Sequence, residues 1–403
     1  MNFMWLQSFS DRISHYSESA DFFIIQRYFE KIYAIHYSAR SWRDRTLWYL
    51  YRALYSLIYL SYIYKTHWVL HHWQDSLSSA NILGVMWFFS AVILRVAILE
   101  WHYPLMQRLQ TFLNDHSYQC SHPAIVTKRA QFYRRTNRLV LAVMAINFVE
   151  IVCFTATNVM KLKDFMLQYR GAIAGGWPVQ VVYGVLTMFW GGTYCMGFMV
   201  CYLLMCIFQL EIDILIQSLE DVGRSLRSGR ESEAFWDNII DRLRPHIYRL
   251  EDLSINLQHL KEVIGPIAYV QYYSTYLVIA DCCFIVVSHG LSSYSIVYFI
   301  SMMVFLTESF FLCHSVENLR NLKPRVASVL YDFDWMLQMQ CSHDPNLSSH
   351  YRHVKRTFLL IIAQSDQPIH FSFAGIGEIS MNSFAQLLEK SYSMLTFLLQ
   401  FAK

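Results

Sequence analysis

Long runs of apolar residues constrain this chain more than any motif does. Six runs are long enough, at about 1.5 Å of rise per residue, to cross about 30 Å of hydrocarbon as helices. Hydrophobic residues make up 55% of the 403 residues and charged residues only 16%, so a soluble fold would expose large apolar patches. The runs cover Thr46–Tyr64, Asn81–Leu99, Leu139–Val159, Val179–Phe208, Gly265–Ser288 and Ser295–Ser315, and a seventh is Ile379–Ala402. The sequence therefore predicts an all-α, polytopic membrane protein with seven transmembrane helices.

A shorter apolar run precedes the last span. Thr357–Ala363 is too short to cross a bilayer, and the helix breakers Pro368, Gly375 and Gly377 separate it from the seventh run. We therefore expect a cytosolic half-helix there. This divides the chain into a six-span region with cytosolic helical extensions, 1–356, and the half-helix with the last span, 357–403.

The distribution of Lys and Arg predicts the orientation, because basic residues stay on the cytosolic side of a membrane. The segments 1–45, 100–138, 209–264 and 316–356 together hold 25 of the 33 Lys and Arg residues. This bias predicts a cytosolic amino terminus and an extracellular carboxyl terminus. Residues 1–20 contain no apolar core of the kind a cleavable signal peptide needs, so we expect the first internal span to direct insertion.

The nine cysteines agree with this orientation. Seven fall in predicted spans, and Cys120 and Cys341 fall in predicted cytosolic loops, so none lies where an oxidising compartment would form disulfides. A seven-helix G-protein-coupled receptor usually has an outer amino terminus and a disulfide that clamps an outer loop. Both features are missing here. That receptor class remains an alternative, and an epitope at Lys403 would test it, because an extracellular carboxyl terminus would exclude a G-protein-coupled receptor.

The largest predicted cytosolic loop, 209–264, has helical periodicity. From Phe235 to Ile264, apolar residues recur every three or four positions, as on one face of a helix. Pro245 should kink or restart this helix. The face would pack on neighbouring cytosolic helices or against another subunit, and the pattern suggests that membrane helices project into the cytosol.

Signatures of enzymes, metals and nucleic acids do not emerge from the sequence. Gly375 and Gly377 lack the third glycine and the strand of a dinucleotide site. His71 and His72 are adjacent, so on a helix they point about 100° apart and do not readily share a metal. The net charge of +3 is too small to indicate nucleic acid. We therefore expect no catalysis, no cofactor and no metal.

Ionisable residues inside spans are informative because each costs energy unless it is paired or wetted. Glu150 lies in the third predicted span and Asp281 in the fifth, where each could form a structural hydrogen bond or contribute to gating. Arg95 lies towards the inner end of the second, and we expect its side chain to snorkel to the cytosolic interface.

Aromatic residues make up 16% of the chain, and many fall within the outer halves of the spans. Ordinary helix packing explains any one of them. Together they would suit a dry cavity for a small, largely apolar molecule, with a few hydroxyl groups in its wall. The residues predicted to line it are Trp87, Phe88, Ile151, Phe154, Tyr183, Trp190, Tyr273 and Tyr276.

The carboxyl-terminal part of the chain resembles the last-helix signature of the insect odorant receptor family. The resemblance rests on Gln367-Pro368, Gly375, Gly377, Ser380, Ser383-Phe384, Leu388, Ser391-Tyr392-Ser393 and Thr396. The sixth span and its exit look like the same family at Thr307-Glu308-Ser309, Asn318-Leu319, Tyr331 and Trp335. Length, span number and orientation also match, although the motifs are specific mainly after residue 265.

This resemblance implies a ligand-gated ion channel subunit. Family members are odorant-gated, non-selective cation channels in the plasma membrane of olfactory neuron dendrites, built as tetramers with the co-receptor Orco. The odorant sits among the outer halves of the second to sixth spans. The chain lacks the longer insertion between the fourth and fifth spans that marks the co-receptor, so it resembles a tuning subunit. Gustatory receptors are the nearest alternative, and Ser391-Tyr392 only approximates their Thr-Tyr motif.

The last helix carries the predicted gate. Leu388, Tyr392, Leu395 and Leu399 recur at steps of four, three and four, so they share one helical face. Periodicity alone would favour packing within the bundle. The resemblance instead implies that this helix lines the pore, with Leu395 as the apolar constriction and Tyr392 on its cytosolic side.

Overall fold

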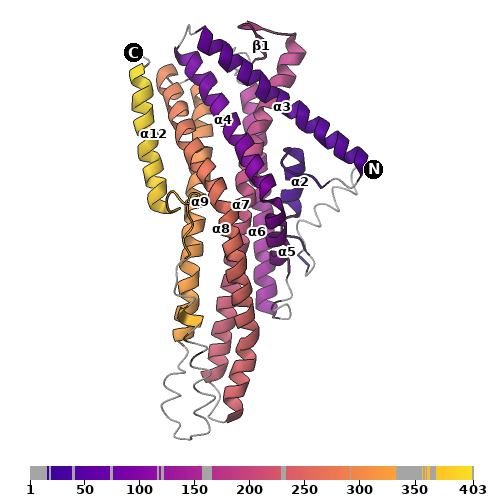
Figure 1. The fold of residues 1–403 in the computed structure, drawn as a ribbon, viewed down its shortest axis with the longest axis vertical. Helices are drawn as coiled ribbons and strands as arrows, with labels where there is room; N and C mark the ends of the chain where they lie inside the picture. The colour runs from indigo at the N-terminus through magenta and orange to yellow at the C-terminus, as the bar shows by residue number, and fades with distance from the viewer. Residues whose placement is uncertain are drawn as a thin grey trace.

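The computed structural model describes residues 16–17, 20–38, 41–72, 76–115, 118, 122–156, 166–227, 233–290, 292–332, 356, 359, 361–363 and 369–401. Almost all of these are helical, and the helices form one elongated bundle (Figure 1). The half-helix predicted at 357–363 is helical at the positions described, 359 and 361–363, and Pro368 lies outside the described residues.

Five of the seven predicted spans lie within a helix. The third, Leu139–Val159, is helical as far as it is described, to Ala156, and the seventh, Ile379–Ala402, is helical from Met381. In chain order these helices are α3 (Trp42–His71), α4 (Ser76–Trp101), α6 (Pro123–Ala156), α7 (Trp177–Arg227), α8 (Glu233–His289), α9 (Ser293–Tyr331) and α12 (Met381–Phe401). Four of them, α4, α7, α8 and α9, are long and apolar enough by composition alone to cross a membrane. Shorter helices α2 (Ile24–Ile32) and α5 (Tyr103–Leu113) lie on the side of the bundle (Figure 1).

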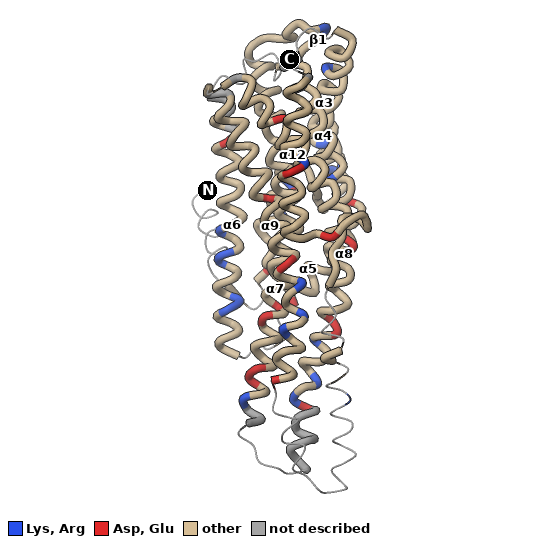
Figure 2. The backbone as a smooth tube through the Cα atoms, turned by 90° about the vertical axis from the view of Figure 1, so that its left-hand side faces the viewer, with Lys and Arg blue, Asp and Glu red and all other residues tan. Residues whose placement is uncertain are grey.

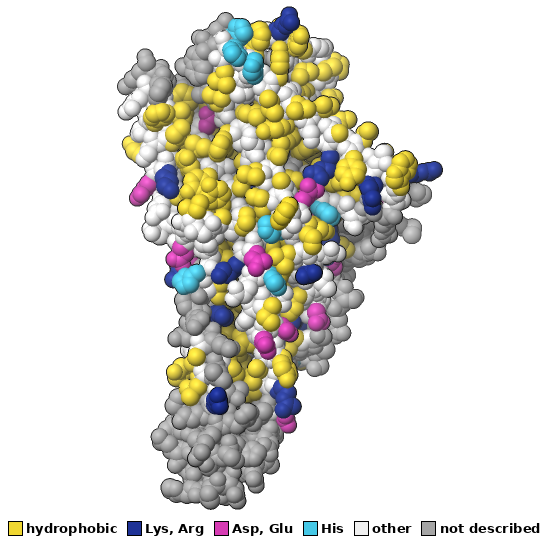
Figure 3. Space-filling model, viewed as in Figure 1, with side chains coloured by type: hydrophobic (Ala, Val, Ile, Leu, Met, Phe, Trp, Pro, Cys, Tyr) yellow, Lys and Arg dark blue, Asp and Glu magenta, His cyan; other side chains and the backbone are white. Residues whose placement is uncertain are grey.

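The outer surface of the helices suits lipid better than water. Along α3, Leu47, Leu50, Leu54 and Leu57 are all at least half exposed. Apolar side chains cover most of the upper part of the face seen in Figure 3, whereas charged side chains become frequent farther down. A soluble protein seldom exposes so continuous an apolar surface, so this part of the bundle is the one that the bilayer covers.

The lower part of the bundle is formed by helices that extend beyond the spans. The helix α7 has 51 residues and α8 has 57, and the Lys and Arg residues concentrate in this part (Figure 2). The predicted helical projections beyond the spans are therefore present, and their cytosolic side stays a prediction. Of the kink or restart expected at Pro245, the restart is wrong, because α8 continues through both Pro245 and Pro266. Packing along a long buried helix face can offset the single backbone hydrogen bond that a proline removes.

A tight turn precedes α12, where Gly375 and Gly377 predicted a break. Ser372 and Glu378 form an isolated antiparallel bridge, and Gly375 has a φ of +86° that favours glycine. Arg320 of α9 holds this segment through an ion pair with Glu378 at 2.7 Å. The turn thus fixes where α12 begins, and α12 then packs against α8 and α9 at the edge of the bundle (Figure 1).

A two-stranded hairpin lies at the upper end of the bundle in Figure 1, where α12 also ends. Strands β1 (Gln168–Tyr169) and β2 (Ala172–Ile173) are joined by Arg170 and Gly171, whose φ values of 53° and 74° match a type I′ turn. Tyr169 stacks on Tyr64 of α3 with ring centroids 5.8 Å apart. This contact ties the segment before α7 to the end of α3.

Candidate functional site

A cavity of about 140 Å³ lies inside the half of the bundle predicted to be outer. Five helices supply its wall, namely α4, α6, α7, α8 and α9. An engineered apolar cavity of about 150 Å³ accepts benzene, so the space suits a molecule with a ring-sized body. The lining residues are Gly84, Val85, Phe88, Phe89, Asn147, Glu150, Thr187, Met188, Gly191, Tyr194, Cys195, Val278, Asp281, Cys282, Tyr298, Ser301, Val304 and Phe305.

Three aromatic rings close the end of the cavity that is nearer the predicted cytosolic side. Phe88, Tyr194 and Phe305 come from α4, α7 and α9, and each ring contacts the other two. The centroids are 5.3 Å apart for Phe88 and Tyr194, 5.0 Å for Tyr194 and Phe305, and 5.9 Å for Phe88 and Phe305. A ligand in the cavity would rest on this triangle, since aromatic faces and edges offer favourable contacts to apolar and cationic groups.

Most polar groups in the wall already have protein partners. Tyr298 donates from its hydroxyl to Asn81 Oδ1 at 2.8 Å, and Thr187 donates to the backbone oxygen of Tyr183 at 2.8 Å. Ser301 donates to Glu150 Oε1 at 2.8 Å, which gives Glu150 a structural hydrogen bond inside the membrane. These contacts occupy the hydroxyl groups with protein partners, and the rest of the wall is largely apolar.

Asp281 differs from these groups. In the described part of the chain, its carboxylate has no hydrogen-bond or ion-pair partner. The carboxylate lies against the backbone of Gly84, so close that a Cβ atom at position 84 would be 2.1 Å from Oδ2. Gly84 therefore makes the space that the carboxylate occupies.

Arg95 is buried directly behind the aromatic triangle. The side chain is 1% exposed, its Nη1 donates to the backbone oxygen of Tyr194 at 2.8 Å, and its guanidinium lies 3.7 Å from the centroid of the Tyr194 ring. The expected snorkelling to the interface is wrong. The side chain can stay inside because the ring and the carbonyl stabilise its charge.

The predicted pocket residues do not all meet at this cavity. Phe88 lines it. Trp87, Tyr273 and Tyr276 instead line a separate hollow between α4 and α8, at the surface where Trp87 is 45% exposed.

The other predicted pocket residues either lie away from this cavity or have side chains that the structure does not describe. The Tyr183 hydroxyl lies 2.7 Å from Ser61 Oγ beside a third hollow between α3 and α7, and Trp190 is buried and stacked on Tyr55 at 4.9 Å. The side chains of Ile151 and Phe154 lie outside the described residues. Whether these residues bind a ligand stays a prediction.

Residues that the aromatic pattern missed form much of the cavity wall. Asn147 and Glu150 are three positions apart on α6, and Tyr298, Ser301 and Phe305 follow steps of three and four on α9. Polar residues at helical spacing within an apolar run were the signal that could have found them, because such residues face the bundle interior rather than lipid.

The predicted gate residues lie on a side of α12 that is partly open in the single chain. Leu388 is 41% exposed and Tyr392 is 68% exposed, whereas Leu395 and Leu399 are partly buried against the core. The side that packs against the bundle carries the buried Leu387 and Ser391. The four residues thus flank the packed side, and their role in a pore stays a prediction.

No group of three or more His, Cys, Asp and Glu residues among those described is arranged to hold a metal ion. The cavity lining offers hydrophobic contact, one unpartnered carboxylate and a few hydrogen-bonding groups. It can bind and orient a small molecule.

Known proteins resemble this chain in sequence and in fold. A family model described as 7tm Odorant receptor matches residues 75–392. Odorant receptor 85f of Drosophila melanogaster is 24% identical over 197 residues, which is 48% of this chain and 45% of that protein, so the match spans about half of this relative's length.

Two structures of the insect olfactory receptor OR5 from Machilis hrabei share the fold. One has a TM-score of 0.70 at 12% identity. The other, in complex with eugenol, has a TM-score of 0.68 at 13% identity. Both comparisons cover 100% of each chain.

Proposed function

The chain belongs to the 7tm Odorant receptor family, and on this premise we propose that it is the odorant-binding subunit of an odorant-gated, non-selective cation channel. It is a multi-pass membrane receptor and not an enzyme. In the proposal, it assembles with the co-receptor Orco as a heterotetramer in the plasma membrane of an olfactory neuron dendrite.

The observation that carries the proposal is the cavity among α4, α6, α7, α8 and α9. These helices hold the second to sixth predicted spans, whose outer halves are where the family resemblance implies an odorant site. The cavity is largely apolar and suits a ring-sized molecule. OR5, which shares the fold, has been solved in complex with eugenol, and this supports a small-molecule ligand here.

The exposed side of α12 supports the channel part of the proposal. Leu388 and Tyr392 are apolar or amphipathic groups that a single chain leaves uncovered. Other subunits around a central pore would face this side. A ring of apolar side chains there, one from each subunit, would close the pore by excluding water. Ligand binding would open the pore by moving the aromatic side chains and helices that connect the cavity to α12.

A cavity-filling variant tests the binding part. Val304→Trp places a large ring in the cavity wall, and we expect it to abolish odorant-evoked currents in cells that co-express Orco. Ile296→Trp is the matched control, because Ile296 is on the same helix and 54% exposed. Normal currents from both variants at normal surface levels would refute the proposed ligand site. Calcium or current responses that need Orco, but no G protein, would distinguish the channel from a G-protein-coupled receptor.

A further inference from the structure

We propose that the odorant of this receptor is a small amine and that the Asp281 carboxylate is the group that recognises its nitrogen. The inference rests on the proposed function of the cavity as the ligand site. It adds the chemical class of the ligand and the residue that selects it.

The first step is the state of Asp281 before a ligand binds. Its carboxyl group lines the cavity, and the described residues provide it with no hydrogen-bond or ion-pair partner. Glu150, the other carboxyl group in the wall, accepts a hydrogen bond from Ser301. A carboxylate without a partner in an apolar cavity is unfavourable. A ligand group that pairs with it therefore gains binding free energy, because it satisfies a group that the protein leaves unsatisfied.

The second step is the charge of the wall. Two lining residues are carboxylic acids, and none of the lining residues is Lys, Arg or His. Arg95 lies behind the ring of Tyr194 and is not part of the wall. The rings of Phe88 and Phe305 line the same space, and aromatic rings attract cations. Both features favour a ligand that carries or accepts positive charge.

The third step concerns the proton. If Asp281 is ionised and the amine protonated, the two form a charge-assisted hydrogen bond. If Asp281 is protonated and the amine is neutral, the carboxyl O–H of Asp281 donates a hydrogen bond to the lone pair of the amine nitrogen. These two pairs contain the same atoms and differ only in which partner holds the proton. A basic nitrogen therefore satisfies Asp281 in either form, whereas a hydrocarbon satisfies neither.

Gly84 is the positioning residue for this contact. A Cβ atom at position 84 would be 2.1 Å from Asp281 Oδ2 and 2.5 Å from Cγ, so any side chain there must displace the carboxylate. Gly191 offers a matched comparison in the same wall, because a Cβ atom there would come no closer than 3.6 Å to its nearest neighbour, Asn147 Nδ2. Gly84→Ala should move the recognising group, and Gly191→Ala should leave it in place.

The experiment uses sets of three ligands with equal numbers of non-hydrogen atoms, such as benzylamine, benzyl alcohol and ethylbenzene. The full chain is co-expressed with Orco, surface levels are matched, and half-maximal concentrations are read from currents. Across the panel, we expect amines to act at concentrations about tenfold to a hundredfold lower than the matched hydrocarbons. Asp281→Asn and Gly84→Ala should both remove most of this preference, and Gly191→Ala should keep it.

The outcomes separate the two proposals. If amines are no more potent than the matched alcohols and hydrocarbons, or if the preference survives in both Asp281→Asn and Gly84→Ala, the assignment of Asp281 is wrong. In that case, loss of the hydrocarbon responses in Val304→Trp would still support the cavity as the ligand site. Should Asp281→Asn fail to reach the surface, Gly84→Ala with its Gly191→Ala control decides the question alone.

Discussion

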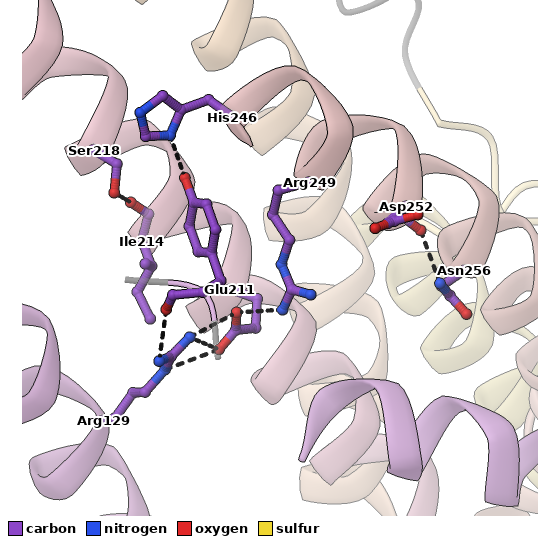
Figure 4. A network of polar contacts seen from close by, with 9 residues as sticks. Arg129, Glu211, Ile214, Ser218, His246, Arg249, Asp252 and Asn256 are labelled. Atoms are coloured by element: carbon purple, nitrogen blue, oxygen red, sulfur yellow. Dashed lines mark hydrogen bonds and ion pairs between the residues drawn. The ribbon is translucent and has the colours of Figure 1, made fainter. Parts of the chain in front are cut away.

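Arg129 and Glu211 form a fully buried, bidentate ion pair between α6 and α7 (Figure 4). Arg129 Nη2 lies 3.0 Å from Oε1 and 3.1 Å from Oε2 of Glu211, and Arg129 Nε lies 3.2 Å from Oε1. Arg249 of α8 donates to the same carboxylate at 2.7 Å. One carboxylate thus joins three helices in the lower part of the bundle.

Glu211→Gln should destabilise the receptor by about 3–5 kcal/mol, because it leaves two buried guanidinium groups without their counter-charge. We expect a clear drop in the midpoint of thermal unfolding of the purified receptor, together with low surface expression. The control is Glu220→Gln, which removes an exposed pair with Arg224 on the same helix. The control should cost about 0–1 kcal/mol. Equal midpoints for the two variants would contradict a stabilising role for the cluster.

Phe88→Ala and Tyr276→Ala distinguish the two places where the predicted pocket residues lie. Phe88 belongs to the aromatic triangle at the end of the cavity, whereas Tyr276 lines the surface hollow between α4 and α8. If the odorant occupies the cavity, Phe88→Ala should raise the half-maximal concentration about 5- to 150-fold, as expected for the loss of about 1–3 kcal/mol of ring contact. Tyr276→Ala should then have a much smaller effect.

The same pair of variants can give the opposite result. A large shift from Tyr276→Ala, with little change from Phe88→Ala at equal surface levels, would move the odorant to the surface hollow. Trp87 and Tyr273 would then be the next residues to substitute, since they line that hollow with Tyr276.

The orientation can be tested at the one glycosylation sequon in the sequence, Asn346-Leu347-Ser348, which lies outside the described residues. The distribution of Lys and Arg places this loop in the cytosol, where N-glycans are not added. We expect glycosidase treatment to leave the mobility of the protein unchanged, and an epitope at Lys403 to stain on intact cells. A mobility shift that disappears in Asn346→Gln would reverse the predicted orientation.

Much of the fold could be predicted because it follows from local properties of the chain. Apolar runs long enough to cross a bilayer have to be helical, since lipid offers no partners for backbone groups. The periodic apolar residues after Phe235 likewise indicated that α8 begins far outside the membrane, as it does at Glu233. Gly375 marked the turn before α12, because few other residues adopt its φ of +86°.

The site was harder to predict because it depends on which helices meet. The sequence shows that Arg95 lies in a span. It does not show that Tyr194, on another helix, offers a ring and a backbone carbonyl to the guanidinium of Arg95. Likewise, Gly84 and Asp281 are nearly two hundred positions apart, and only the packing of α4 against α8 reveals their contact. Aromatic content could suggest a cavity, but not which rings face it.

The gate prediction depends on α12 lying with one side towards the bundle and another towards the pore. Leu387 and Ser391 are buried against the bundle, and Leu388 and Tyr392 are next to them on the uncovered side. Leu395 lies one turn beyond Ser391, partly buried. If four such helices surround a pore, a ring of Leu395 side chains would form an apolar constriction that excludes water when closed.

Leu395→Ser should let water enter this constriction and raise the current that flows without odorant, provided that the subunit contributes to a mixed pore with Orco. In Leu395→Cys, the new thiol should react faster with an externally applied, membrane-impermeant reagent when odorant is present, because opening moves the side chains apart. Phe397→Cys is the control, since Phe397 points to another side of α12 and is 49% exposed. Its modification rate should not depend on odorant. If Leu395→Cys channels show neither odorant-dependent modification nor a changed resting current, Leu395 is not the gate, and the same scan at Leu388, Tyr392 and Leu399 would locate the constriction on this helical face.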